Sequence, residues 1–479
     1  MGVYGRREFL KRAACGAAVM SLPKGGFGCA GISAAASRKR PNILLIMIDD
    51  LGWMDLGCQG NDRLDTPNID RLAREGMRFT DFYAAAPVCS PTRAAIMAGQ
   101  SPARLGLTTH IPDRPGYRPD ESPLLSAETR NYLPLDHVTL AEHLREGGYA
   151  TAFIGKWHLS GVRESDDVAL NEPDLRPEHQ GFDLNIGGCS YGGPPTYWDP
   201  YRIPNISPRR EGEYLPDRLA DETIAFMKAH KAEPFFIALW NYTVHWPMEA
   251  PQKLVEKYEK RLGPGLKDAR YGAMIEAMDA AMGRVFDTLE RLGLAEDTLL
   301  IFTSDNGGFG GVSDCRPLRA SKGYLYEGGI RVPLIVRRPG KVRPGTLCDM
   351  PVVSTDFYPT ILAVAGLKPD PDKKIDGESI VPLLRQTGGL RRKAIHFHYP
   401  NYAWHGSNRL GGAIREGDYK LIEWYDDGSV ELYNLKDDIG EKTDLSRLQP
   451  GKAADLKAKL DAWLAETGAK MPRKLSDNS

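Results

Sequence analysis

Asn42-Ile-Leu-Leu-Ile-Met-Ile48 is a continuous apolar run that follows Arg40-Pro41 and stops at Asp49-Asp50. A strand with one solvated face would alternate apolar and polar side chains, and this run does not alternate. It therefore predicts a strand that is buried on both faces, as in a parallel sheet covered by helices on either side.

Three further apolar runs have the same character and are separated by helical segments. They cover residues 149–154, 235–240 and 298–303. Helices are predicted over residues 67–75, with Thr66 as the cap, over 139–147, and over 271–292, where apolar side chains recur at helical spacing. Alternating strands and helices predict an α/β fold with a large, mostly parallel central sheet.

Residues with polar or ionisable side chains, which can bind ligands or take part in catalysis, follow each of the four predicted strands. The strands run into Asp49-Asp50, Lys156-Trp157-His158, residues 242–245, and Ser304-Asp305-Asn306. Open parallel sheets bind ligands beyond the carboxyl ends of their strands. We therefore expect the functional site at this edge of the sheet.

The sequence pattern changes after residue 385. Short strand-like segments at 395–399, 413–415, 419–424 and 430–434 precede a helical segment over 453–467. They predict a small α+β domain with an antiparallel sheet. We divide the chain into a signal region (1–36), a main α/β domain (40–385) and this small C-terminal domain (390–479).

Composition limits the classes of partner. The chain has 479 residues, 42% of them hydrophobic, which is enough for a large core. It carries 62 Lys and Arg against 63 Asp and Glu, so the formal net charge is -1. A balanced charge gives no overall attraction to nucleic acid or to an anionic membrane. We expect no nucleic-acid partner and no transmembrane segment.

The first residues resemble a twin-arginine export signal. Arg6-Arg7-Glu8-Phe9-Leu10-Lys11 precedes an apolar run over 13–22, which is too short to span a bilayer. A disordered basic tail is the alternative interpretation. A lipid anchor at Cys29 is not expected, because Gly26 stands where lipid-attachment signals carry an aliphatic residue. The pattern predicts export by the twin-arginine route to the periplasm or the exterior.

Cysteine spacing singles out one residue. Beyond the signal the chain has Cys58, Cys89, Cys189, Cys315 and Cys348, an odd number without a Cys-x-x-Cys pair, which argues against zinc and against a dense disulfide framework. Cys89 opens a predicted helix that continues to Gly99, so it lies where backbone amides favour anions. Taken alone, a cysteine at such a position more often has a structural role.

The string Cys89-Ser90-Pro91-Thr92-Arg93 resembles the signature of the type I sulfatases of the alkaline phosphatase superfamily, whose cysteine is oxidised to formylglycine. Other sulfatase-like blocks follow in the family's order: Asp49-Asp50-Leu51-Gly52, residues 148–158, His245-Trp246-Pro247, Asp305-Asn306-Gly307-Gly308, and Lys322 with residues 326–331. The resemblance covers residues 41–384. It implies an alkaline-phosphatase-like sandwich, sulfuric ester hydrolysis, and a formylglycine-generating enzyme as a partner during maturation. It departs at Arg319-Ala320-Ser321, where many relatives carry glycine.

Four of the residues at the strand ends offer only oxygen ligands: Asp49, Asp50, Asp305 and Asn306. Such a set suits a hard cation such as Ca²⁺ and disfavours Zn²⁺. An Asp-Asp pair also caps turns, but the recurrence at a second strand end favours a metal site. By resemblance, the modified Cys89 completes the ligand set.

The resemblance also implies roles for the basic residues. One hydroxyl of hydrated formylglycine 89 attacks the sulfur, while Ca²⁺ and three cationic side chains, Arg93, Lys156 and Lys322, neutralise the ester oxygens. His245, with Lys322, would give a proton to the leaving alcohol, and His158 would take one from the second hydroxyl. Lys156, His245 and Lys322 would also bind substrate. Each of these residues could alternatively be a surface charge or a structural histidine, and only their combination favours catalysis.

An aromatic and basic mixture in the small domain predicts a sulfated carbohydrate as substrate. The residues are His398, Trp404, His405 and Arg415. Aromatic faces stack on sugar rings, and Arg or His binds anionic groups. The alternative is that these residues pack the small sheet. Two rival functions also remain open: a phosphate or phosphonate ester hydrolase of the same superfamily, and a secreted glycan-binding protein without catalysis.

Overall fold

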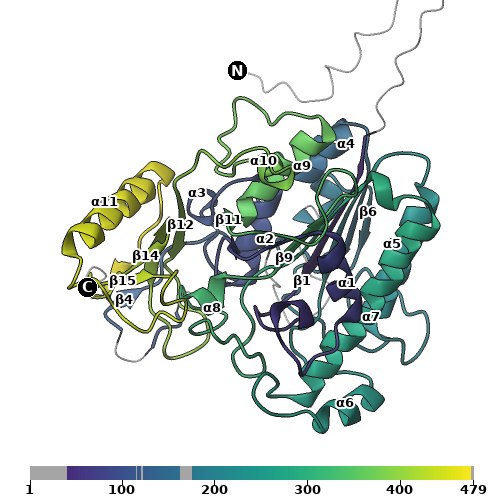
Figure 1. Ribbon diagram of the computed structural model, residues 1–479, viewed down its shortest axis with the longest axis horizontal. Helices are drawn as coiled ribbons and strands as arrows, with labels where there is room; N and C mark the ends of the chain where they lie inside the picture. The colour runs from purple at the N-terminus through teal and green to yellow at the C-terminus, as the bar shows by residue number, and fades with distance from the viewer. Residues whose placement is uncertain (1–39, 115, 120–121, 162–174, 476–479) are drawn as a thin grey trace, which may run out of the picture. The chain divides into compact units, whose positions relative to one another are not determined.

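The central sheet has eight strands in the order β10-β2-β9-β8-β1-β7-β5-β6. Three of them, β9, β1 and β6, are labelled in Figure 1. The computed structural model describes residues 40–114, 116–119, 122–161 and 175–475, and the predicted signal region lies outside them. The strands are β1 Asn42–Ile48, β2 Met77–Phe79, β5 Ala150–Gly155, β6 Leu184–Ile186, β7 Phe235–Asn241, β8 Thr298–Ser304, β9 Leu334–Arg337 and β10 Thr346–Cys348.

The four strands predicted from apolar runs form the middle of this sheet. β1 pairs in parallel with β7 on one side and β8 on the other, and β5 pairs in parallel with β7. β9 is antiparallel to both β8 and β2. The predicted α/β fold with a mostly parallel sheet is confirmed, and the carboxyl ends of four adjacent parallel strands meet at one edge.

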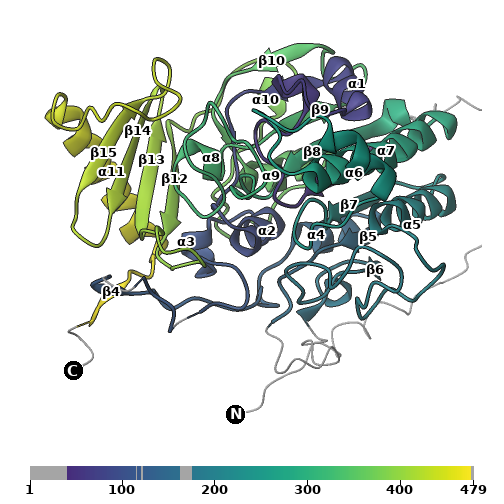
Figure 2. The same cartoon turned by 90° about the horizontal axis from the view of Figure 1, so that it is seen from below.

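Helices cover both faces of the sheet, as the two-sided burial of β1 requires (Figure 2). Alternate residues of β1 belong to two different apolar cores: Leu44, Ile46 and Ile48 face one, and Ile43, Leu45 and Met47 face the other. The first core contains α1 (Pro67–Glu75), α5 (Leu215–Ala229) and α7 (Ala269–Arg291). The second contains α2 (Cys89–Ala98), α4 (Leu140–Glu146) and α9 (Phe357–Ala365).

Helix ends agree with the sequence signals in most cases. Thr139 makes a capping box with Glu142 at the start of α4, and Gly99 ends α2 with a φ of 68°. The predicted cap by Thr66 is not formed, because the Thr66 hydroxyl donates to Asp70 and accepts from the N–H of Gly57. The shorter helices are α3 Pro102–Leu105, α6 Gln252–Glu259, α8 Glu327–Ile330 and α10 Val381–Leu384.

A second, antiparallel sheet follows, as predicted. Its strands are β12 Ala394–Tyr399, β13 Gly411–Glu416, β14 Tyr419–Trp424 and β15 Val430–Asn434, in that order. One face packs on α11 (Pro450–Thr467) and the other on apolar residues around β3 (Phe82–Tyr83) and α2. Two short pairs, β3 with β11 (Val352–Val353) and β4 (Leu124–Leu125) with β16 (Arg473–Lys474), complete the strands. Within the described residues, no helix is long and apolar enough to cross a membrane.

Candidate active site

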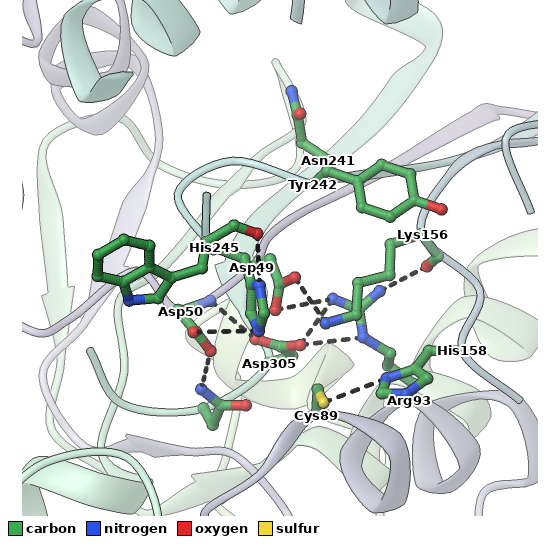
Figure 3. A network of polar contacts seen from close by, with 12 residues as sticks. Asp49, Asp50, Cys89, Arg93, Lys156, His158, Asn241, Tyr242, His245 and Asp305 are labelled. Atoms are coloured by element: carbon green, nitrogen blue, oxygen red, sulfur yellow. Dashed lines mark hydrogen bonds and ion pairs between the residues drawn. The ribbon is translucent and has the colours of Figure 1, made fainter. Parts of the chain in front are cut away.

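Three carboxylates meet where β1 and β8 end. Oxygen atoms of Asp49, Asp50 and Asp305 all lie within 4.8 Å of one another, and the three residues are buried (Figure 3). Asp50 holds a left-handed backbone conformation, with φ of 59°, and its N–H donates to Asp305 Oδ1 at 3.2 Å. This conformation is uncommon outside glycine, and it fits a chain that turns sharply to place two successive carboxylates at one point.

Three cations surround this cluster from three different elements. Arg93, one turn into α2, donates from Nη2 to Asp305 Oδ2 at 2.6 Å. Lys156, just after β5, donates to Asp49 Oδ2 at 2.6 Å, and Lys322 donates to Asp50 Oδ2 at 2.8 Å. All three side chains are almost fully buried. The predicted basic residues are therefore brought together with the predicted acidic ones.

Two oxygens of the site are left without hydrogen bonds. Asp49 Oδ1 and Asn306 Oδ1 are buried and have no hydrogen-bond partner, although Arg93 Nη2 lies 3.5 Å from Asp49 Oδ1. Asn306 turns its amide nitrogen to Asp50 Oδ1 at 2.8 Å. Buried oxygens are normally paired, so these atoms mark a place for a cation. The donors are all oxygens, which suits a hard ion such as Ca²⁺.

The pKa values of the carboxylates reflect uneven compensation of charge. Burial raises the pKa of Asp49 well above its usual value despite Lys156. Burial is also the largest single influence on Asp50 and Asp305, but the nearby basic side chains, led by Lys322 at the first and Arg93 at the second, together lower the pKa. Negative charge is thus least compensated at Asp49, which also carries one of the unpaired oxygens.

Cys89 lies beside this cluster at the first residue of α2. It is 3% exposed, and its Sγ lies 3.3 Å from Nδ1 of His158. The other ring nitrogen of His158 donates to the carbonyl of Ile111. Burial, and then the charge of Lys156, lower the pKa of His158 well below its usual value. A neutral ring that donates from Nε2 presents the lone pair of Nδ1 to residue 89, which is the state a base requires.

His245 lies next to Asp50 in the same cavity lining. Its Nε2 lies 3.8 Å from Asp50 Oδ2, and its Nδ1 donates to the carbonyl of Trp246 at 3.0 Å. The preceding segment is held by the backbone of Asp49, whose N–H donates to Thr243 O at 2.8 Å. Burial and the nearby Lys322 lower the pKa of His245 to about 3. An anionic ester bound beside the ring would raise this pKa and favour the proton-donating imidazolium.

A cavity of about 270 Å³ opens onto these residues. Its lining includes residues that the sequence identified, namely Asp50, Cys89, His158, His245, Lys322 and Trp404. It also includes residues that the sequence analysis missed: His110, Ile111, Arg114, Gly192, Trp246 and Phe309. The adjacent motif residue His245 was a signal for Trp246, whereas nothing in the pattern of residues 110–114 indicated a role.

The small-domain residues predicted to bind substrate are only partly in place. Trp404 lines the cavity. His405 follows it in the sequence and stacks on Tyr324, with 4.5 Å between the ring centroids. His398 is 2% exposed and bonds Tyr425 and the carbonyl of Lys470. The Arg415 guanidinium pairs with Asp81 and the Tyr83 hydroxyl. His398 and Arg415 are therefore outside the cavity, with their polar atoms used in packing the small sheet.

Known proteins match over most of the chain. The family model described as Sulfatase matches residues 41–367, and that for the C-terminal region of N-sulphoglucosamine sulphohydrolase matches residues 320–470. Arylsulfatase A of Homo sapiens is 35% identical, covering 82% of this chain and 76% of that protein. A sulfatase of Formosa agariphila is 33% identical and covers 90% of both chains. The crystal structure of Ps i-CgsB in complex with k-i-k-neocarrahexaose superposes with a TM-score of 0.75 at 29% identity, covering 89% of this chain and 93% of that one.

Proposed function

This chain belongs to the sulfatase family and is a sulfuric ester hydrolase, and on that premise we propose that it removes sulfate from a sulfated carbohydrate with a formylglycine made from Cys89. The observation that carries the proposal is the position of residue 89. It shares one cavity with Asp50 and Lys322, and it faces the free lone pair of His158. Oxidation of the thiol to a hydrated aldehyde would place oxygen beside a cluster of hard ligands.

The metal is proposed to be Ca²⁺, held by the carboxylates of Asp49, Asp50 and Asp305, by Asn306 Oδ1 and by the modified residue 89. When bound, such an ion would neutralise negative charge on the ester oxygens and on the nucleophile. The side chains present fit this ion because they supply oxygen donors, two of which lack hydrogen bonds.

The protein's own side chains then have distinct tasks. Once residue 89 is converted, Arg93, Lys156 and Lys322 would hold the sulfate oxygens. One hydroxyl of residue 89 would give its proton to a carboxylate of the cluster and form the new O–S bond as the bond from sulfur to the alcohol breaks. His245 gives the leaving alcohol its proton. His158 takes the proton of the second hydroxyl through Nδ1, the bond between residue 89 and the sulfate oxygen breaks, sulfate leaves and the aldehyde returns.

The carbohydrate substrate is supported by the cavity wall and by relatives. Trp246 and Trp404 line the cavity, and Trp246 is 44% exposed, so its ring is accessible to a ligand. Aromatic faces of this kind stack on sugar rings. Ps i-CgsB was crystallised with a neocarrahexaose, and N-acetylgalactosamine-6-sulfatase of Rattus norvegicus is 31% identical to this chain.

Export by the twin-arginine route to the periplasm or the exterior is also proposed, with conversion by a formylglycine-generating enzyme beforehand. The Arg6-Arg7 pair supports the twin-arginine route. This route carries folded proteins, so Cys89 could be converted in the cytoplasm before export. Replacing both arginines with lysine should leave the protein in the cytoplasm with residue 89 still converted.

A pair of measurements tests the function. Mass spectrometry of the peptide bearing residue 89, from active native protein, should show formylglycine; an unmodified thiol would overturn the mechanism. Aryl sulfate should be hydrolysed faster than the matching aryl phosphate. A phosphate preference would favour the phosphate ester alternative, whose fold is shared: a phosphonate monoester hydrolase of Agrobacterium radiobacter superposes with a TM-score of 0.64 at 20% identity.

A further inference from the structure

We propose that Arg114 binds a second anionic group of the substrate, a sulfate or a carboxylate on the same sugar or the next one, and so makes the enzyme selective for multiply charged glycans. The inference rests on the proposed function, and it adds a specificity-determining residue and a narrower substrate class.

Arg114 is an uncompensated charge on the cavity wall. The other charged residues of the lining, Asp50 and Lys322, pair with each other at 2.6 Å. The Arg114 side chain is exposed and, within the described residues, makes no hydrogen bond or ion pair. Its neighbour Asp113 is engaged elsewhere, since its carboxylate accepts from Asn131 Nδ2 at 2.7 Å. A positive charge left available on a wall attracts an anion from solution.

The segment that carries Arg114 is fixed directly to the catalytic residues. The N–H of Ile111 donates to the hydroxyl of Ser90, the residue after Cys89, at 3.1 Å, and the Ile111 carbonyl accepts from His158. The position of Arg114 is therefore set by the same helix that presents residue 89. This anchors the backbone that leads to Arg114 beside the cavity, while its unpaired side chain stays available to an anion.

The sulfate to be cleaved already has its own cations. Arg93, Lys156 and Lys322 all contact the carboxylate cluster beside residue 89, whereas Arg114 contacts none of it. The cavity of about 270 Å³ is near the lower end of small-molecule sites, which begin at about 300 Å³, so it has room for about one sugar ring. Trp246, Trp404 and Phe309 offer that ring apolar walls, and Arg114 remains for a charge on its periphery or on the next residue.

The chemistry of the side chain selects the ligand class. A guanidinium presents parallel N–H groups in a plane and binds carboxylates and tetrahedral oxyanions with two hydrogen bonds. Sulfate esters and uronate carboxylates are the anionic groups of this geometry that a sulfated glycan carries. Neutral hydroxyls would gain much less from the same position.

The test compares Arg114→Ala and Arg114→Lys with Arg145→Ala, which removes an exposed arginine on α4 that is outside the cavity and has no ion pair within the described residues. Three substrates are used at fixed salt: an aryl monosulfate, a disulfated monosaccharide, and a monosulfated disaccharide with a uronate. Arg114→Ala should reduce kcat/KM for at least one sugar substrate at least about tenfold more than for the aryl sulfate. Arg114→Lys should lie between, and Arg145→Ala should leave the ratios unchanged.

Each outcome has a defined meaning. A selective loss on the disulfated sugar identifies sulfate as the second group, and a selective loss on the uronate disaccharide identifies carboxylate. Equal losses on all three substrates, or no loss, would overturn the inference while leaving the sulfatase function intact. Binding of both sugars to Cys89→Ala protein, measured by calorimetry with and without Arg114→Ala, gives the same comparison without turnover. If wild-type protein hydrolyses no sulfate ester although residue 89 is converted, the proposed function fails, and the calorimetry still decides the role of Arg114.

Discussion

Replacing Lys420 with methionine is expected to lower the free energy of unfolding by several kcal/mol, because this side chain joins the small sheet to the main domain. Lys420 is fully buried on β14, with Nζ 2.9 Å from Glu327 Oε1 and 2.8 Å from Glu441 Oε1. Without Lys420, the Glu327 carboxylate would still form an ion pair with Arg331 at 3.1 Å. The Glu441 carboxylate would retain only the hydrogen bond from the N–H of Glu327, at 2.7 Å. Breaking a buried ion pair from one side costs about 3–5 kcal/mol, because a charge is left without a partner.

The loss should depend on pH, because Glu441 avoids the cost by binding a proton. Burial raises the pKa of Glu441 from 4.5 to about 7 even with Lys420 present. The folded state therefore holds this proton more tightly than the unfolded state. Its stabilising contribution is complete below a pH of about 4.5 and is lost as the pH rises through about 7. Removing Lys420 raises this pKa further, so the variant should lose more stability at about pH 8 than at about pH 5.

Urea denaturation, followed by tryptophan fluorescence and by circular dichroism at both pH values, measures the effect. Lys452→Met is the matched control: its Nζ lies 3.3 Å from Glu416, but the side chain is 29% exposed, so the loss should be less than about 1 kcal/mol. A double variant with Glu441→Gln should recover part of the loss, with a coupling energy of about 0.5–3 kcal/mol. A loss under about 1 kcal/mol at about pH 8, or the same loss at both pH values, would refute the reasoning.

Three other predictions concern the loop, the base and the metal. Ala320 has a φ of 59°, so Ala320→Gly should raise the free energy of unfolding by about 0.5–1 kcal/mol, and a lower melting temperature would contradict this. His158→Ala should lower kcat by about 10²–10⁴ in protein whose residue 89 is still converted by mass spectrometry; an effect on KM alone would exclude the base role. Removing divalent ions should lower the melting temperature. Adding Ca²⁺ at about 100 times its Kd should raise the free energy of unfolding again by about 2.7 kcal/mol. Restoration by Zn²⁺ but not by Ca²⁺ would contradict an oxygen-ligand site.

The middle of the main sheet could be predicted because its strands are long and buried on both faces. An uninterrupted apolar run has few other interpretations, and β1, β5, β7 and β8 each contain one. The short strands β2, β6, β9 and β10 have three or four residues each and were not predicted. Their pairing depends on neighbours far away in the sequence, such as Met77 with Val336, and local propensity carries no signal of it.

The site residues divide in the same way: some are indicated by the local sequence pattern, and others are placed by contacts between distant segments. Residues that end strands or begin a helix, such as Asp49, Asp305 and Cys89, could be predicted, because sheet topology brings strand ends together. Arg114 could not be predicted, since its place follows from the hydrogen bond between Ser90 and Ile111 and not from any periodicity.

The small sheet shows why composition alone misplaced two substrate residues. Side chains alternate between the two faces of a strand, so residues two apart share a face. On β12, Ile395, Phe397 and Tyr399 pack toward β3 and α2, which leaves His396 and His398 on the face toward α11, where His396 stacks on Trp463. Arg415 pairs in register with Ile395 and so lies on the inner face, but at the end of the strand that meets Asp81. The strand boundaries alone therefore predict which residues share a face. They do not predict what covers each face, and that decides whether a side chain can reach the cavity. Trp404 escapes this rule, because it lies in the loop between β12 and β13 and reaches the cavity directly.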